Sequence, residues 1–239
     1  MRFIDYNGDS IMVAVGGVNY YYYDDGKLVG FHDKAGNYIL DAKSIDPFLD
    51  QVGSALAELG LGNEGTSLIN ELAGPTNNFN IENNGTNDFV PKNQRDSYGN
   101  IPEMQNVSGD HRGSHGSGGT IHFNPNSRQS GFNTAGNRDR PAFIALGHEL
   151  FHGRDSNQGT LYYSRDYTNP VTGAVYNAEH NGLLKSEWRA VYYENTVRGQ
   201  ANIPLRTNYG IQETSPGIYA PLPPRLLDAT NHPINYIVR

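Results

Sequence analysis

Apolar and polar positions alternate over residues 10–40, as they do in β-strands that bury one face. Strands are expected at residues 10–15, 18–23 and 28–31. Turn-forming Asp, Gly and Asn residues separate these segments. We therefore predict a β-rich N-terminal meander over residues 1–43 and a second unit over residues 44–239.

After the meander, apolar residues recur at helical spacing. Helices are expected at residues 44–60, 66–72, 140–153 and 182–199, with a short one near 225–228. Asp139 is expected to cap the third of these helices. Residues 76–118 are rich in Asn, Gly, Ser and Asp, which predicts long loops or short strands. A further strand at 120–124 is expected at an exposed sheet edge beside a cleft, where a peptide can add to it. The mixture predicts an α+β fold with a small sheet.

Composition narrows the classes of partner. The chain carries 18 Lys and Arg against 25 Asp and Glu, a net charge of −7, which argues against nucleic acid because phosphate binding needs a basic face. No stretch approaches the roughly 20 apolar residues of a membrane-spanning helix, so no membrane partner is expected. The N-terminus lacks the basic start and apolar run of a secretory signal. We expect a cytosolic chain, export without a signal peptide, or a piece of a larger protein.

The chain has no cysteine, so a metal site must use His, Asp, Glu or backbone oxygens. His148 and His152 are four residues apart within an expected helix, which brings both imidazoles to one face and within reach of one zinc ion. Glu149 can take a proton from a water molecule that attacks a carbonyl, because zinc lowers the pKa of that water. This H-E-x-x-H pattern predicts the catalytic centre of a zinc hydrolase.

Catalytic zinc needs a third protein ligand and an open position for water. Glu187 is the first candidate, because it lies on the core-facing stripe of the helix expected at 182–199, where a carboxylate needs a partner. Glu194 follows two turns later on the same face. It is either the third ligand or a hydrogen-bonding partner of a ligand histidine. His180 is a weaker candidate for the third position.

Arg206 and Tyr209 lie three residues apart in a loop after this helix, from which both can return to hold the oxyanion of a tetrahedral intermediate. The residues alone leave three functions open. These are peptide hydrolysis, a binding module with a structural zinc and no activity, and a metal-dependent amidase that acts on a non-protein substrate. A closed site with four protein ligands would favour the binding module, and a narrow pocket would favour the amidase.

Several spaced blocks of the sequence resemble one family. They are residues 116–125, 140–152, 187–191, 194–195, 204–206 and Tyr209. Together they are similar to the effector metalloprotease family M91, over about residues 80–210. The resemblance implies an endopeptidase with one Zn²⁺ that cleaves intracellular proteins of a host. It implies a secreted effector or toxin that lacks a signal peptide and acts in the cytosol of the target cell. An immunity protein or a secretion machine as a partner is left open.

The layout of the site residues is also similar to that of clostridial neurotoxin light chains, which pair H-E-L-x-H with a distant glutamate and a later R-x-x-Y. That resemblance implies His148, His152 and Glu187 as metal ligands, Glu149 as the base, and Arg206 and Tyr209 as transition-state stabilisers. From the residues and resemblances together we expect a zincin-like domain of gluzincin type, in which a helix next to the HExxH helix carries the third ligand and a small sheet forms the cleft wall. Residues 10–40 resemble sequences near Rhs repeat cores, which favours a toxin tip cut from a longer protein.

Overall fold

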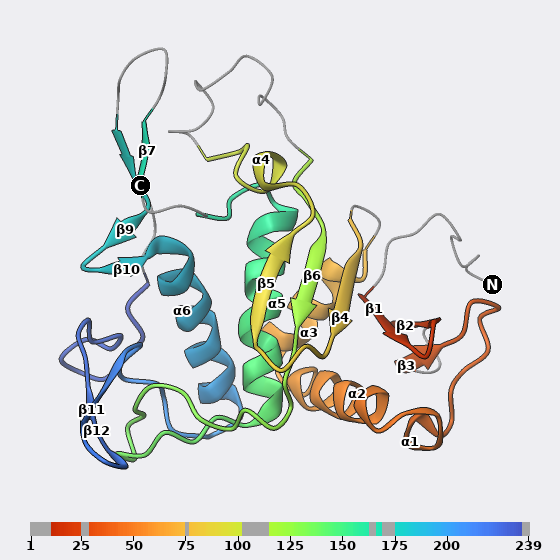
Figure 1. Cartoon of the computed structure of the whole chain (residues 1–239), viewed down its shortest axis with the longest axis horizontal. Coiled ribbons are helices and arrows are strands. Elements are labelled where there is room, and N and C mark those ends of the chain that lie inside the picture. Colours follow the sequence, from red (N-terminus) through yellow and green to blue (C-terminus); the bar gives the residue numbers. More distant parts are fainter. Residues whose placement is uncertain are drawn as a thin grey trace.

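The computed structural model describes the chain in separate stretches (Figure 1). They are residues 11–24, 29–74, 77–101, 115–162, 166–168 and 175–235. In these stretches a six-stranded sheet is combined with helices, so the predicted α+β class is confirmed.

The main sheet has its six strands in the order β3-β2-β1-β4-β6-β5. These are β1 (Ile11–Val15), β2 (Val18–Asp24), β3 (Val29–His32), β4 (Phe79–Glu82), β5 (Asp88–Pro91) and β6 (Gly119–His122). β1, β2 and β3 pair antiparallel as a meander, and β1 then pairs with β4 in parallel. The meander is therefore continuous with the sheet of the remaining chain. The domain boundary after residue 43 stays a prediction.

The other end of this sheet lies next to the predicted site. β4 and β6 are parallel, and β5 pairs antiparallel with β6. β6 is therefore an inner strand, and the prediction that residues 120–124 form an exposed edge is wrong. The edge strand is β5, which carries Pro91 at its end, a residue that sheets accept at their edges. The four residues of β5 are too few to show a clear alternation of apolar and polar positions, so the strand was not predicted individually within the loop-rich stretch.

The helices are α1 (Ala42–Ile45), α2 (Pro47–Leu59), α3 (Asn63–Leu72), α4 (Gln94–Ser97), α5 (Ala142–Asn157) and α6 (Lys185–Gln200). They follow the predicted segments with shifted ends, except for α4, which lies in the stretch predicted to hold loops or short strands. The helix expected at 44–60 is divided because Pro47 disfavours helical backbone at the preceding Asp46. The Asp46 carboxylate instead caps α2 by accepting a 2.7 Å hydrogen bond from the N–H of Phe48.

Helix α5 occupies the centre of the molecule, between the sheet and α6 (Figure 1). Every residue from Phe143 to Ser156 is buried, and the helix packs against α2, α3, α6, β5 and β6. The predicted N-cap, Asp139, is wrong because Pro141 holds that position, with no side-chain hydrogen bond to the described first turn. A polar side chain on so buried a helix must be satisfied by another element rather than by water.

Smaller elements complete the described fold. They are β7 (Asp166–Thr168) with β8 (Val175–Asn177), β9 (Glu179–His180) with β10 (Leu183–Leu184), and β11 (Ile211–Ser215) with β12 (Ile218–Pro221). The helix expected near residues 225–228 is wrong. Arg225 and Leu227 instead form isolated bridges with Asn208 and Pro233, so the segment is extended. None of the helices in the described part of the chain has the length and apolar character that a membrane crossing needs.

Candidate metal centre

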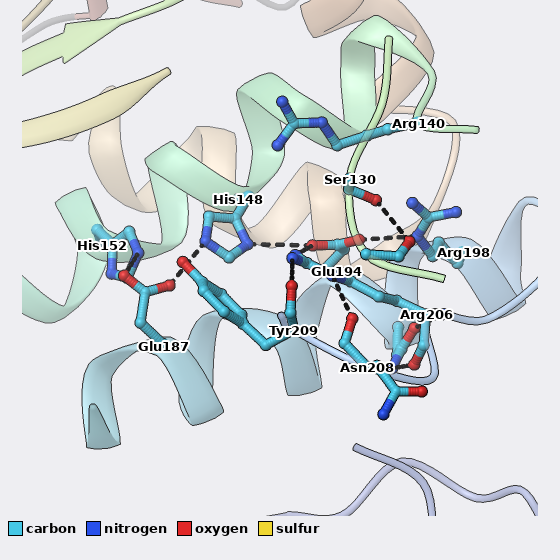
Figure 2. A network of polar contacts seen from close by, with 12 residues as sticks. Ser130, Arg140, His148, His152, Glu187, Glu194, Arg198, Arg206, Asn208 and Tyr209 are labelled. Carbon is cyan, nitrogen blue, oxygen red and sulfur yellow. Dashed lines mark hydrogen bonds and ion pairs between the residues drawn. The ribbon is translucent and has the colours of Figure 1, made fainter. Parts of the chain in front are cut away.

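Three side chains from two packed helices meet in a cluster that could hold a metal ion. His148 and His152 come from successive turns of α5, and Glu187 comes from the first turn of α6. One ligand atom of each residue lies within 4.8 Å of the others. Figure 2 shows the Glu187 carboxylate facing both imidazoles. The helical spacing of the histidines thus places them on one face, toward the neighbouring helix.

The distances and the donor types fit zinc. Nε2 of His148 lies 3.1 Å from one oxygen of Glu187, and Nε2 of His152 lies 3.4 Å from the other. Two ligands that each lie 2.0–2.1 Å from a tetrahedral zinc ion are about 3.3 Å apart. Two imidazoles and a carboxylate are a donor set that catalytic zinc uses. Within the described stretches no fourth His, Asp or Glu joins the cluster, so the arrangement suits an ion with an open position.

His148 is held through both of its ring nitrogens. Nδ1 lies 3.1 Å from an oxygen of Glu194, while Nε2 faces Glu187. A carboxylate on Nδ1 fixes the orientation of the ring and directs Nε2 toward a metal. Burial lowers the pKa of this imidazole, but hydrogen bonds with Glu187 and Glu194 outweigh burial and raise the pKa to about 9. Glu194 thus lies where a partner of a ligand histidine would lie, while Glu187 lies in the cluster itself.

Glu194 is the anion at the centre of a buried network (Figure 2). Its carboxylate accepts a hydrogen bond from Nε of Arg198 at 2.9 Å and one from Nη1 of Arg206 at 3.1 Å. Burial opposes its ionisation, but the charges of Arg206 and Arg198 hold its pKa well below the ordinary value. The carboxylate is therefore ionised where it meets His148, and its contacts are of the strong, charge-assisted kind.

Arg206 and Tyr209 both lie at the site, but at different depths. Arg206 is buried against Glu194, and its Nη2 donates to the backbone oxygen of Tyr209 at 3.2 Å. Tyr209 lines the cleft, with its hydroxyl directed toward Glu187 and His148 (Figure 2). Burial and the charge of Glu187 raise the pKa of this hydroxyl above its ordinary value. The guanidinium that was expected to face a substrate therefore lies behind Tyr209, whose side chain lines the cleft.

Asn195 anchors this returning segment to α6, a role that the sequence pattern did not reveal. Its side-chain oxygen accepts from the N–H of Arg206 at 2.7 Å, and its amide donates to the oxygen of the same residue at 3.0 Å. Arg198, the other unassigned residue of the network, lies four positions after Glu194 on the same helix. A carboxylate and a guanidinium at this helical spacing can pair, so the sequence contained a signal for the contact between Glu194 and Arg198.

The cluster opens into a cleft of about 310 Å³. It is lined by Asn87, Asp88, Phe89, His148, Glu149, His152, Leu161, Tyr162, Leu184, Ser186, Glu187 and Tyr209. Burial raises the pKa of Glu149, and the nearby charges of His148 and His152 oppose that effect. A carboxylate whose pKa is raised toward neutrality is suited to accept a proton. The β5 residues in this lining were not recognised from the sequence because they lie within the loop-rich stretch.

A second ion pair joins the two ligand-bearing helices. Nη2 of Arg189 donates to Oδ1 of the buried Asp155 at 2.8 Å. Asp155 lies one turn after His152, and Arg189 lies two positions after Glu187, so the pair ties the turns that carry these residues. Burial raises the pKa of Asp155, and the charge of Arg189 opposes this. His180, the weaker candidate ligand, lies on β9 and outside the cluster.

Comparison with known proteins supplies the family. No curated protein matches the chain. The model of the peptidase M91 family, described as effector protein, matches residues 37–209, which is well over half of the chain. That range contains α5, α6 and every residue of the cluster. The resemblance seen in the sequence is thereby confirmed, and the chain belongs to the peptidase M91 family of effector proteins.

Proposed function

We propose that this chain is a zinc-dependent endopeptidase with a zincin-like domain, which hydrolyses peptide bonds of intracellular target proteins. The observation that carries the proposal is the buried cluster of His148, His152 and Glu187, which lies in a cleft of a chain from a peptidase effector family. Two ligands on one helix, with Glu149 beside the first and the third ligand on the next packed helix, match a gluzincin-type HExxH site.

His148, His152 and Glu187 would hold the ion. When bound, zinc acts as a Lewis acid that polarises the scissile carbonyl and lowers the pKa of the attacking water. Glu149 accepts the proton of this water and passes it to the leaving amine. The burial that raises its pKa suits a group that must both take up and release a proton near neutral pH.

Tyr209 would donate its hydroxyl proton in a hydrogen bond to the oxyanion. Its raised pKa keeps that proton in place at physiological pH. Arg206 was expected to share this task. We propose instead that it is a positioning residue, because it is 5% exposed, does not line the cleft and binds both Glu194 and the backbone of Tyr209.

The substrate would bind along β5. This strand has β6 as its neighbour in the described sheet, and its other edge is unpaired there. An extended peptide can add to such an edge through backbone hydrogen bonds. Since Asn87, Asp88 and Phe89 line the same cleft as the ligand cluster, a peptide on β5 would pass across the cluster. The edge function expected of residues 120–124 is thus proposed for β5.

The effector family supports delivery into another cell, and we place the substrates among the cytosolic proteins of that cell. Secretion without a signal peptide and release from a larger toxin both fit this proposal. The net charge of −7 favours proteins over nucleic acids as partners. A secretion machine and an immunity protein are the further partners that such a route would involve.

Two features favour peptide hydrolysis over the alternatives. A structural zinc is held by four protein ligands, whereas the described residues contribute three to the cluster. An amidase for a compact non-protein substrate would not need a strand edge beside its cleft, and the edge position of β5 suits an extended peptide.

Glu149→Gln tests the mechanism, with zinc content and cleavage of a proteome-derived peptide mixture as the measurements. The wild type should bind one zinc ion and lose activity in chelator. The variant should keep its zinc and lose about 10²–10⁴-fold in kcat. Full activity in a zinc-loaded Glu149→Gln chain would refute the proposed base. A zinc-loaded wild type that cleaves no peptide would refute the endopeptidase.

A further inference from the structure

Asp88 stands in the cleft wall without a part in the proposed chemistry. It is the first residue of the edge strand β5, and it lines the same cleft as the ligand cluster. Nearly half of its side chain, 47%, is exposed. A carboxylate in this position can contact a bound peptide directly.

Two neighbours hold this carboxylate in a defined orientation. One oxygen lies 2.5 Å from Nδ1 of His122 on β6, and the other accepts from the hydroxyl of Thr86 at 2.6 Å. Partial burial opposes ionisation, but the hydrogen bonds with Thr86 and His122 lower the pKa of Asp88 below its ordinary value. The group is therefore an oriented anion at neutral pH, and little side-chain entropy is lost when a ligand binds to it.

Among the described residues Asp88 forms its ion pair with His122 and none with a Lys or Arg side chain, so its negative charge is uncompensated whenever His122 is neutral. The other two carboxylates that line the cleft, Glu149 and Glu187, would be balanced by the two positive charges of a bound zinc ion. In the loaded enzyme Asp88 is then the fixed negative charge of the cleft wall that remains for a substrate.

We propose that Asp88 is a specificity-determining residue that binds a Lys or Arg side chain of the substrate, close to the scissile bond. Side chains of a peptide on β5 alternate between two directions, so every second one can face the cleft wall. A basic side chain beside Asp88 would form a charge-assisted hydrogen bond, whereas an acidic one would be repelled. This inference rests on the endopeptidase function proposed above.

The test uses the full chain loaded with zinc and peptides that are acetylated at the N-terminus. A degenerate peptide library first identifies a cleaved sequence, and matched peptides then carry Lys, norleucine or Glu at each position around the cleaved bond. The variants are Asp88→Asn, Asp88→Lys and Glu58→Gln. Glu58 is an exposed carboxylate on α2 outside the cleft lining, so its variant controls for the loss of one negative charge.

The wild type and Glu58→Gln should prefer Lys over norleucine at one position by roughly tenfold in kcat/KM, the scale of one partly exposed charge-assisted contact. Asp88→Asn should abolish that preference, so that kcat/KM for the Lys peptide falls about tenfold relative to kcat/KM for the norleucine peptide. Asp88→Lys should shift the preference to the Glu peptide. A merely structural role of Asp88 would lower the rates for all three peptides together.

The possible failures are distinguishable. Cleavage without a basic preference, or an equal loss for every peptide in Asp88→Asn, would overturn this inference and leave the endopeptidase in place. If the acetylated peptides show no preference and the same peptides with a free N-terminus do, Asp88 would be assigned to a terminal amine, and the inference would be overturned as well. A zinc-loaded wild type that cleaves no peptide in the library would overturn both proposals.

Discussion

Glu194→Gln replaces one carboxylate oxygen by an amide nitrogen at the centre of the buried network and nearly preserves the volume. Three contacts converge on this carboxylate, from Arg198 at 2.9 Å, Arg206 at 3.1 Å and His148 at 3.1 Å. The Glu194 side chain is 0% exposed, and those of Arg198 and Arg206 are 1% and 6% exposed. The guanidinium groups cannot regain water, so removing their anion should cost about 3–5 kcal/mol.

Glu194→Gln should therefore have two separate effects, one on stability and one on zinc affinity. In a chain of this size 1 kcal/mol shifts Tm by about 2–4 °C, so the metal-free Tm should fall by about 6–20 °C. Loss of the carboxylate on Nδ1 of His148 should also weaken zinc binding by about 10–100-fold. Glu187→Gln is the matched control on the same helix. Its side chain is 20% exposed and lies among the ligands, so it should lose less metal-free stability and more zinc affinity.

Scanning calorimetry in chelator measures the metal-free stability, and competition against a fluorescent chelator measures the zinc affinity. The reasoning would be refuted if metal-free Glu194→Gln melted within about 2–4 °C of the wild type, because the buried arginines would then not depend on their anion. A larger loss of zinc affinity in Glu194→Gln than in Glu187→Gln would exchange the roles assigned to the two glutamates.

Three further changes probe other parts of the structure. The raised pKa of His148 means that its stabilising contribution is complete below pH 6.5 and is lost as the pH rises through about 9. In calorimetry of the metal-free chain, the free energy of unfolding should fall by up to about 3 kcal/mol as the pH rises from 6.5 through about 9, while zinc affinity rises. A stability that does not change over this pH range would contradict the reasoning. Arg189→Met should lower the free energy of unfolding by about 2–3 kcal/mol, measured by urea denaturation, because it leaves the buried Asp155 carboxylate without its partner. Adding Asp155→Asn should restore most of the lost stability. Gly116→Ala should lower the free energy of unfolding by well over the roughly 1–2 kcal/mol expected for Gly136→Ala, although both glycines have positive φ. A Cβ at 116 would lie 1.9 Å from a backbone oxygen, and one at 136 would meet nothing within 4 Å. Equal losses would contradict the packing argument.

The candidate ligands could be found in the sequence because short-range rules place them. Helical geometry alone brings His148 and His152 to one face. Glu187 was recognisable because a carboxylate on an apolar stripe needs a partner. The ends of the two helices were less predictable. The N-cap positions are held by Pro141 and Leu184, whose side chains make no capping hydrogen bond, so the usual signal for a helix start is missing.

The cleft wall could not be predicted because it depends on pairing between distant segments. β5 is an edge strand only because β6 inserts between it and β4, and no local pattern encodes that order. The role of Arg206 was hidden for a similar reason. An R-x-x-Y spacing is compatible with a guanidinium in the cleft or behind it. Asn195 holds the backbone of Arg206 against α6, and the guanidinium of Arg206 donates to Glu194 behind the cleft. The R-x-x-Y spacing encodes neither contact.

The burial of α5 explains why the polar side chains that this helix contributes to the site are held by partners on other elements rather than by water. Each polar side chain that this helix turns toward its neighbours needs a partner there. His148 meets Glu194, Asp155 meets Arg189, and Arg154 meets Glu64. Two of these pairs join α5 to α6, at Arg189 and at Glu194, which both follow Glu187 along α6. Contacts with residues outside the cluster, Glu194 and the Asp155–Arg189 pair, therefore help to hold the histidines at their distance from Glu187. It follows that zinc would bind to ligands already in place, so its affinity depends on partners that never touch the ion.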